Sequence, residues 1–437
     1  LFSVLHGLHH FYYNRGEWQR ARAVGEEMVN LANANQDPLL YAEAHQALSI
    51  VLFHLGKFDL ALRQAEQGVA AYDRTQQQAY LRLYGQDPGM VCLSYAAQAL
   101  WCLGYFDQAR QRIEEAIRIG EELAHPFTLT RALNFLAILN HFAGDAEGTL
   151  AATEARSALI RKYGFQHYLG GTQVMRGWAL SELGRGEVNE MQQGLATMHA
   201  GGSIIGRHYF LSTIAVAYAN NGQVADGLRI LDEAVAAIPL SGHFWEAEVF
   251  RLKGALLLML DATDQTGEAE RALQQGIALA RQQGGRGLEL RAMVTLGQLW
   301  QRQGKTALAR QELLAIYRWY HEGFGSADLR RAQDLLAALG ETVTANPSGA
   351  PPPPVAVRPA EQLIPPSVAE RARDSKAVST TQTPNTRRQR LQDWGEAPTA
   401  TYFYGRQSEV DLLKQWLLDE RRRLVMVLGM GGMGKTT

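Results

Sequence analysis

The sequence predicts an all-α superhelical solenoid of stacked helical hairpins, followed by a disordered linker and by the first strand and loop of a truncated α/β domain. Three observations predict this order. A glycine-centred pattern returns roughly every 40 residues through about the first 340 residues. The composition then changes to Pro, Ser, Thr and Gln near Gly340. At the end of the chain an apolar run, Leu424–Leu428, precedes a glycine-rich loop.

Each repeat consists of an apolar helix, a glycine and a second helix with Ala five residues after the glycine. Glycine permits the sharp reversal, an aromatic residue two positions later fills the gap between the helices, and Ala lets them approach closely. The pattern predicts eight helix–turn–helix units. Clear copies are Gly16 with Trp18 and Ala21, Gly56 with Phe58 and Ala61, Gly104 with Phe106 and Ala109, Gly267 with Ala272, and Gly304 with Ala309; weaker copies begin at Gly144, Gly184 and Gly222.

Apolar residues within the units follow the period of a helix. In the second unit Leu48, Val51, Leu52 and Leu55 form one apolar stripe, and its partner stripe begins at Phe58. Proline is favoured at the first position of a helix, and Asp is favoured immediately before it. We therefore expect new helices at Pro38, Pro88 and Pro126, with Asp37 and Asp87 as N-caps.

This pattern resembles the tetratricopeptide repeat (TPR), with helices longer than those of the minimal unit. Several short segments resemble more narrowly the repeat regions of large bacterial predicted ATPases, which often follow a nucleotide cyclase or kinase domain. The resemblance implies a regulatory repeat module that carries no catalytic residue and holds a protein or peptide ligand in its groove. The segments are Tyr84–Gly89, Cys92–Ala97, Leu100–Tyr105, Ala278–Ala280, Leu288–Ala292, Leu299–Gly304 and Tyr317–Phe324.

Few residues of the array are candidates for chemistry. His6, His9 and His10 lie at helical spacing, which admits a metal site, but no carboxylate or Cys lies beside them in sequence and an aromatic-rich helix face is the alternative. Most of the tryptophans at helix seams are expected in the core, and a few of them in the concave groove; they are Trp101, Trp178, Trp245, Trp300 and Trp319.

Bulk composition excludes several classes of protein. The formal net charge is −1, so no global field attracts nucleic acid or an acidic membrane. The two cysteines, Cys92 and Cys102, cannot form a disulfide framework and are expected to pack as small hydrophobes, which agrees with a cytoplasmic protein. No apolar run has membrane-spanning length. The chain begins with Leu1 rather than Met, and we expect it to be a piece of a longer polypeptide.

Three domains are predicted: the helical array at 1–340, a linker at 341–390 and the start of a second domain at 391–437. The linker contains Pro351–Pro354 and many Ser, Thr, Gln and Arg residues, so it cannot bury enough apolar area to offset its chain entropy. The basic cluster Arg387–Arg390 is expected to be a solvated part of this tether, with contact to phosphate or an acidic partner as the alternative.

The last stretch has the spacing of a phosphate-binding P-loop, Gly429-x-x-x-x-Gly434-Lys435-Thr436. Glycines let successive N–H groups point at phosphate oxygens, where side chains would collide. The loop is expected to wrap phosphates with Gly429, Gly431, Gly432, Met433 and Gly434, while Lys435 reaches the β- and γ-phosphates and the Thr436 hydroxyl ligates Mg²⁺.

The segment that leads to the loop contains Phe403-Tyr404-Gly405-Arg406, a predicted helix after Ser408, and the apolar strand. Together with the P-loop it resembles the N-terminus of NB-ARC-like STAND ATPases, which are signalling switches. The lead-in Trp394–Pro398 resembles bacterial multidomain members that carry WD or TPR repeats. The resemblance implies that the main chain of Phe403–Arg406 lies against adenine and that Thr437 joins Lys435 and Thr436 around phosphate and Mg²⁺.

These residues imply ATP or ADP with Mg²⁺ as the ligand but no catalytic residue. The acidic strand, sensor residues and winged-helix lid of the family do not occur in the 437 residues, so ATP hydrolysis requires a fuller domain. A signalling STAND ATPase is the leading interpretation. A non-enzymatic TPR scaffold and the regulatory region of a larger cyclase or kinase remain as alternatives. The order is unusual, because repeats in these families usually follow the ATPase.

Overall fold

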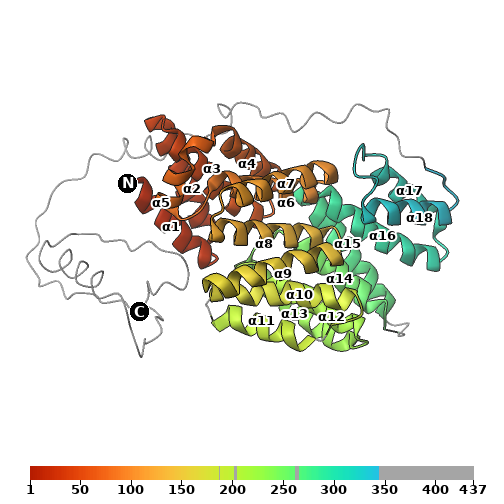
Figure 1. Ribbon diagram of the computed structural model, residues 1–437. Helices are drawn as coiled ribbons and strands as arrows, with labels where there is room; N and C mark the ends of the chain where they lie inside the picture. The colour runs from red at the N-terminus through yellow and green to blue at the C-terminus, as the bar shows by residue number, and fades with distance from the viewer. Residues whose placement is uncertain (187, 201–203, 261–264, 344–437) are drawn as a thin grey trace, which may run out of the picture. The chain divides into compact units, whose positions relative to one another are not determined.

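The computed structural model describes residues 1–186, 188–200, 204–260 and 265–343, and the helices in these ranges stack in pairs (Figure 1). Eighteen α-helices, two short 3-10 helices and no strand occur among the described residues. The predicted linker from residue 344 on, and the predicted nucleotide-binding residues, lie outside these ranges. The described part of the chain is therefore an all-α, TPR-like array of helices.

Eight antiparallel hairpins account for most of the helices. They are α1 (Phe2–Asn14) with α2 (Trp18–Asn35), α3 (Pro38–His54) with α4 (Phe58–Ala71), α6 (Pro88–Leu103) with α7 (Phe106–Glu122), α8 (Pro126–Phe142) with α9 (Ala146–Tyr163), α10 (Leu169–Glu182) with α11 (Val188–Ala200), α12 (Arg207–Asn220) with α13 (Val224–Ser241), α14 (Glu246–Leu257) with α15 (Thr266–Gln283), and α16 (Arg286–Arg302) with α17 (Thr306–Tyr317). The remaining elements are η1 (Arg74–Gln76), α5 (Gln77–Tyr84), η2 (Gln166–Tyr168) and α18 (Ala327–Ala338), which packs on α16.

The predicted hairpin turns are confirmed in seven of the eight units. Their glycines adopt positive φ angles, as at Gly16 and Gly104. The exception is Gly267, which lies inside α15, so the turn before it falls earlier than predicted. Ala269, which is fully buried, occupies the close-approach position that was assigned to Ala272. A glycine just inside a helix and one in the turn give the same sequence pattern, which explains this error.

The predicted helix starts are confirmed at Pro38 and Pro88. The Asp37 Oδ1 atom accepts a hydrogen bond from the Leu39 N–H at 2.9 Å, and Asp87 Oδ1 accepts one from the Met90 N–H at 2.8 Å. Helix α8 also begins at its proline, Pro126. These caps satisfy N–H groups that the first turn of a helix leaves without a partner.

The first helices of the hairpins form an inner layer. Every residue of α6 is buried, and α3 is buried continuously from Ala42 to His54. By contrast, α7 buries one face and exposes the other. A helix that is apolar on all sides requires cover on all sides, so the inner layer must be enclosed by protein. Cys92 and Cys102 are unpaired and buried in α6, which confirms their packing as small hydrophobes.

Cover for the inner layer comes from parts of the chain that are far apart in sequence. The turns of the first three hairpins, at Gly16, Gly56 and Gly104, lie against Leu240, Gln283 and Trp319, respectively. We call this line of contacts the seam. A Cβ atom added to Gly16 would lie 2.2 Å from the Leu240 carbonyl oxygen, and one added to Gly104 would lie 3.0 Å from Trp319. The turn glycine of the fourth hairpin, Gly144, has no atom within 4 Å of the same point. The first three turns therefore pack against later parts of the array, whereas the turn at Gly144 is exposed.

The Gly16→Ala and Gly144→Ala variants test this closure. Both place a side chain at a positive φ angle, which costs about 1 kcal/mol. Gly16→Ala should cost about 2–3 kcal/mol more, because its methyl group meets the Leu240 backbone. Urea denaturation measures both values. Equal losses in the two variants would show that the Gly16 turn does not pack against residue 240.

Candidate functional site

The nucleotide-binding residues predicted from the sequence all lie outside the described residues, so their roles stay predictions. They are Phe403, Tyr404, Gly405, Arg406, Gly429, Gly431, Gly432, Met433, Gly434, Lys435, Thr436 and Thr437. The described array itself offers an inner face, a seam and two small surface grooves as places where ligands or partners can bind.

Aromatic side chains fill much of the inner face. We call this set the aromatic column. Ring centroids of successive members lie 4.3–6.4 Å apart, a spacing at which aromatic pairs attract beyond the burial of their area. The column joins the first hairpin to the segment that follows the last one. Its members are Trp18, His54, Phe244, Trp245, Phe142, Trp101, Phe106 and Tyr320.

The expectation that most of these tryptophans lie in the core is confirmed. Trp101, Trp178, Trp245 and Trp300 are buried, whereas Trp319 is half-buried beside Tyr105 and Tyr320 at the seam. Because the aromatic column occupies the inner face where Trp101 and Trp245 lie, an extended peptide has no room along this part of the array in the observed conformation.

A buried ion-pair network, which we call the Arg291 network, crosses the interior. Arg291 Nε donates to Asp328 Oδ2 at 2.9 Å, and its Nη1 lies 3.5 Å from Glu248 Oε1. Both carboxylates are at most 4% exposed. Burial opposes the charge of Arg291, but these carboxylates outweigh it and raise its pKa. The same guanidinium lies 4.6 Å from the Trp101 ring centroid and donates to the Phe142 carbonyl, so it ties α6, α8, α14 and α18 together.

The seam contains a helix cap supplied from a distance. Tyr105, the N-cap residue of α7, makes no side-chain cap. Instead Glu322 Oε1 accepts from the N–H groups of Asp107 and Gln108 at 3.1 and 3.2 Å, and Asp107 Oδ2 accepts from the Gly323 N–H at 2.9 Å. This reciprocal arrangement has the logic of a capping box, but its two halves come from the third hairpin and from the segment after the last hairpin.

The histidines of α1 form no metal centre. His6 Nε2 pairs with Glu43 Oε1 at 2.9 Å, and burial lowers the pKa of His9 to about 4. Among the described residues no group of three His, Cys, Asp or Glu side chains is placed to hold a metal ion. His6 and His9 are buried, and His6 packs against Tyr84. The Glu43 partner was not foreseen, because it comes from α3.

A Ser–His pair in the core also lacks the geometry of a catalytic site. His208 Nδ1 lies 2.8 Å from Ser241 Oγ, but that hydroxyl donates to the Ala237 carbonyl. His208 must therefore donate to Ser241 and cannot act as its general base. His208 is fully buried, and burial lowers its pKa to about 3.

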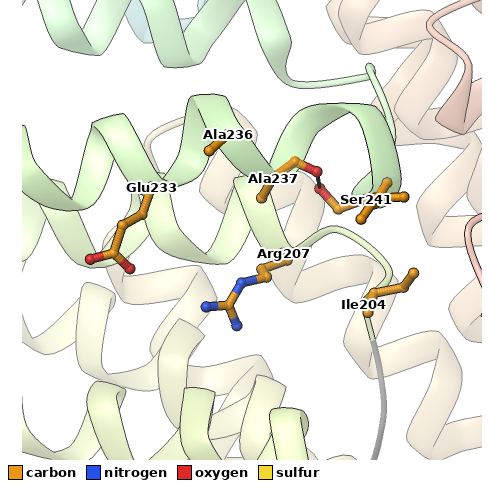
Figure 2. A pocket seen from close by; sticks show the side chains of 7 residues that line it. Ile204, Arg207, Glu233, Ala236, Ala237 and Ser241 are labelled. Carbon is orange, nitrogen blue, oxygen red and sulfur yellow. Dashed lines mark hydrogen bonds between the residues drawn. The ribbon is translucent and has the colours of Figure 1, made fainter.

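A shallow groove of about 340 Å³ lies between α13 and the start of α12 (Figure 2). Figure 2 shows the side chains of Arg207 and Glu233, which line the groove together with the small side chains of Ala236 and Ala237 on α13. Leu240, which is 62% exposed, completes the lining with Ile204 and Ser241. The groove can take a small apolar side chain next to the charged Arg207 and Glu233.

Two arginines on neighbouring helices stand apart from the ion pairs described above. Arg156 of α9 is 5% exposed; its Nε donates to the Thr130 carbonyl at 3.3 Å and its Nη1 to Thr172 Oγ1 at 2.5 Å. Arg131 of α8 donates to Gln86 Oε1 and lies 5.6 Å from the Phe135 ring centroid. Neither arginine contacts a carboxylate among the described residues.

None of the described helices combines the length and the apolar character that crossing a membrane requires. No protein-family model matches the chain.

Two curated bacterial proteins match parts of the sequence. One is the uncharacterized WD repeat-containing protein alr2800 of Nostoc sp. (strain PCC 7120), which is 58% identical over 45 residues, 10% of this chain. The other is the uncharacterized protein R02095 of Rhizobium meliloti (strain 1021), which is 21% identical over 219 residues, 49% of this chain. The chain spans only 4% and 21% of the lengths of these relatives.

Solved helical-repeat structures resemble the chain loosely. A Rap protein complexed with competence and sporulation factor has a TM-score of 0.38 at 11% identity, covering 68% of this chain and 74% of that one. Yeast Tom70 has a TM-score of 0.37 at 12% identity, covering 74% of this chain and 58% of that one. Likenesses at this level leave the ligand of this chain open.

Glu322→Ala tests the remote cap. Loss of the carboxylate leaves the Asp107 and Gln108 N–H groups without their partner, which should lower the free energy of unfolding by about 1 kcal/mol. Hydrogen exchange at those two amides should accelerate. Glu114→Ala, on the exposed face of the same helix, is the matched control. Unchanged exchange at Asp107 and Gln108 would contradict the cap.

Acidification should destabilise the array. Burial lowers the pKa of His9 and His54 to about 4 and that of His141 and His208 to about 3. Unfolded histidine gains its proton near pH 6.5, so the unfolded state binds more protons below that pH. Between pH 7.5 and 5.5 each buried histidine should therefore remove roughly 1 kcal/mol of stability.

Thermal unfolding at the two pH values measures the acid effect. His141→Gln should reduce the difference between them, whereas replacing the exposed His199 by Gln should not. An unchanged melting temperature from pH 7.5 to 5.5 would show that these imidazoles are accessible to protons in the folded state.

Proposed function

We propose that this chain is part of a signalling ATPase of the STAND type, in which residues 403–437 begin the nucleotide switch and the helical array recruits a protein partner. The observation that carries the proposal is the P-loop spacing of Gly429–Thr437 after an apolar run of sequence, on the same chain as eight stacked hairpins. In support, a short match of high identity links the chain to a WD repeat-containing protein, alr2800. The lead-in Trp394–Pro398 resembles STAND proteins with such repeats.

Lys435 and Thr436 supply the chemistry of nucleotide binding in this proposal. The lysine ammonium neutralises the β- and γ-phosphates, and the threonine hydroxyl ligates Mg²⁺. Backbone N–H groups of the glycine loop complete the cradle. The partner binds the array on its outer helices or on the part of the inner face outside the aromatic column.

Coupling between the two parts would run through the seam. Glu322 and Asp328, which hold α7 and Arg291, lie within about 20 residues of the start of the predicted linker. A change of nucleotide state that moves the linker therefore acts first on these contacts. The array would then shift between a closed and a more open population, each favoured by one nucleotide.

The leading alternative is a TPR scaffold that binds no nucleotide, or the regulatory region of a larger cyclase or kinase. The extensive self-packing of the inner layer agrees equally well with a rigid scaffold. Nucleotide binding separates these functions from the STAND proposal, because only the latter requires an occupied P-loop.

Lys435→Ala in the 437-residue chain is the direct test. Loss of a charge-assisted contact of about 2 kcal/mol should weaken ADP binding about thirty-fold, as measured by calorimetry with Mg²⁺ present. Lys414→Ala, which removes a lysine in the predicted helix before the strand, should leave affinity unchanged. Equal affinity in all three proteins, or no ADP binding by the unaltered chain, would favour the scaffold.

A further inference from the structure

We infer that one face of α1 is a docking surface for the second helix of a further hairpin of the same repeat type. This face, which we call the α1 stripe, consists of Val4, Leu8 and Phe11. The three residues follow one another at helical spacing, and Leu8 is 37% and Phe11 53% exposed. The stripe belongs to the first hairpin of the array, so it is distinct from the nucleotide site and from the partner surfaces proposed above.

Equivalent positions in the next two hairpins are buried. Leu8 and Phe11 precede the turn glycine of their hairpin by eight and five residues, as Leu48 and Val51 do in the second hairpin. Leu48 and Val51 are only 7% and 0% exposed. In the third hairpin the same two positions are fully buried alanines, Ala96 and Ala99. Because the three helices share one apolar pattern, the exposure of the α1 stripe comes from the place of α1 in the stack.

The preceding hairpin supplies the cover at these positions. A Cβ atom added to Gly25 of α2 would lie 3.4 Å from Leu48 Cδ1, so the backbone of α2 packs directly on that leucine of α3. A Cβ atom added to Gly68 of α4 would lie 2.5 Å from Cys92 Sγ on α6, at the position that corresponds to Val4. In both cases the second helix of one hairpin presents a glycine to the first helix of the next. Among the described helices none takes this place on the α1 stripe.

The last helix of the array shows how this fold ends a stack. α18 packs its apolar residues on α16 and α17 and exposes a polar face. That face carries Arg330, Arg331, Gln333 and Asp334. Terminal repeats of soluble arrays require such a face, whereas α1 exposes the apolar face of an inner repeat. The occupant of the α1 stripe therefore has the chemistry of α2 and α4, an amphipathic helix with glycine or alanine at the contact.

A second copy of residues 1–40, joined directly before Leu1 of the full chain, tests this inference. The addition keeps the 40-residue step from Gly16 to Gly56, so its second helix should stack on α1 as α2 stacks on α3. The melting temperature should rise by about 4 °C, and hydrogen exchange of the α1 amides should slow. The matched control carries Gly25→Glu in the added copy only. It places a carboxylate against the α1 stripe and should remove the gain.

Phe11→Gln distinguishes a hairpin from a second copy of the chain as the occupant. In the unaltered chain this variant should shift the melting temperature by less than about 1 °C, because Phe11 is exposed. In the extended chain it should lower the melting temperature by about 3 °C, because the ring is then buried. Equal rises in the two extended chains, or no rise in either, would overturn the inference. A dimer of the unaltered chain in sedimentation velocity that Phe11→Gln dissociates would also overturn it.

Discussion

The Arg291 network is the interaction on which the closure of the array most depends. Its guanidinium meets a carboxylate from α14, a carboxylate from α18, a carbonyl from α8 and a ring from α6. An ion pair of this kind adds little net stability over a well-packed apolar replacement, but breaking one half of it is expensive. We therefore expect its effect to be on specificity: with Arg291 charged, an arrangement that brings Glu248 and Asp328 to its guanidinium is favoured.

Closure changes how stability is distributed along a repeat protein. In an open solenoid each repeat contacts only its neighbours, so stability is nearly a sum over repeats. Here the aromatic column runs from the first hairpin to the segment after the last one, and the Glu322 cap joins that segment to the third hairpin. Loss of a terminal hairpin would expose the inner surface of another hairpin far along the chain. The described array should for this reason unfold as a larger cooperative unit than an open solenoid of the same length.

The hairpins could be predicted from the sequence because their signals are local. Gly16, Trp18 and Ala21 lie close together in the sequence, and Asp37 and Pro38 are adjacent. The error at Gly267 arose because a glycine in a turn and a glycine just inside a helix give the same sequence pattern. The seam could not be predicted, because nothing near Tyr105 indicates that Glu322 will cap its helix. The P-loop is also a local signal, but its residues lie outside the described part of the chain.

Arg156 shows why burial must be known before the role of a charged residue can be interpreted. In the sequence Arg156 is one of several charged residues on an outer helix, and its neighbours Glu154 and Arg161 are indeed exposed. Arg156 instead turns inward between α8 and α10 and ends on neutral oxygens. Its helix position did not distinguish it from a solvated arginine; only the missing counter-ion did. The buried Arg291 is held by carboxylates from two other helices, whereas the buried Arg156 is held by a carbonyl and a hydroxyl.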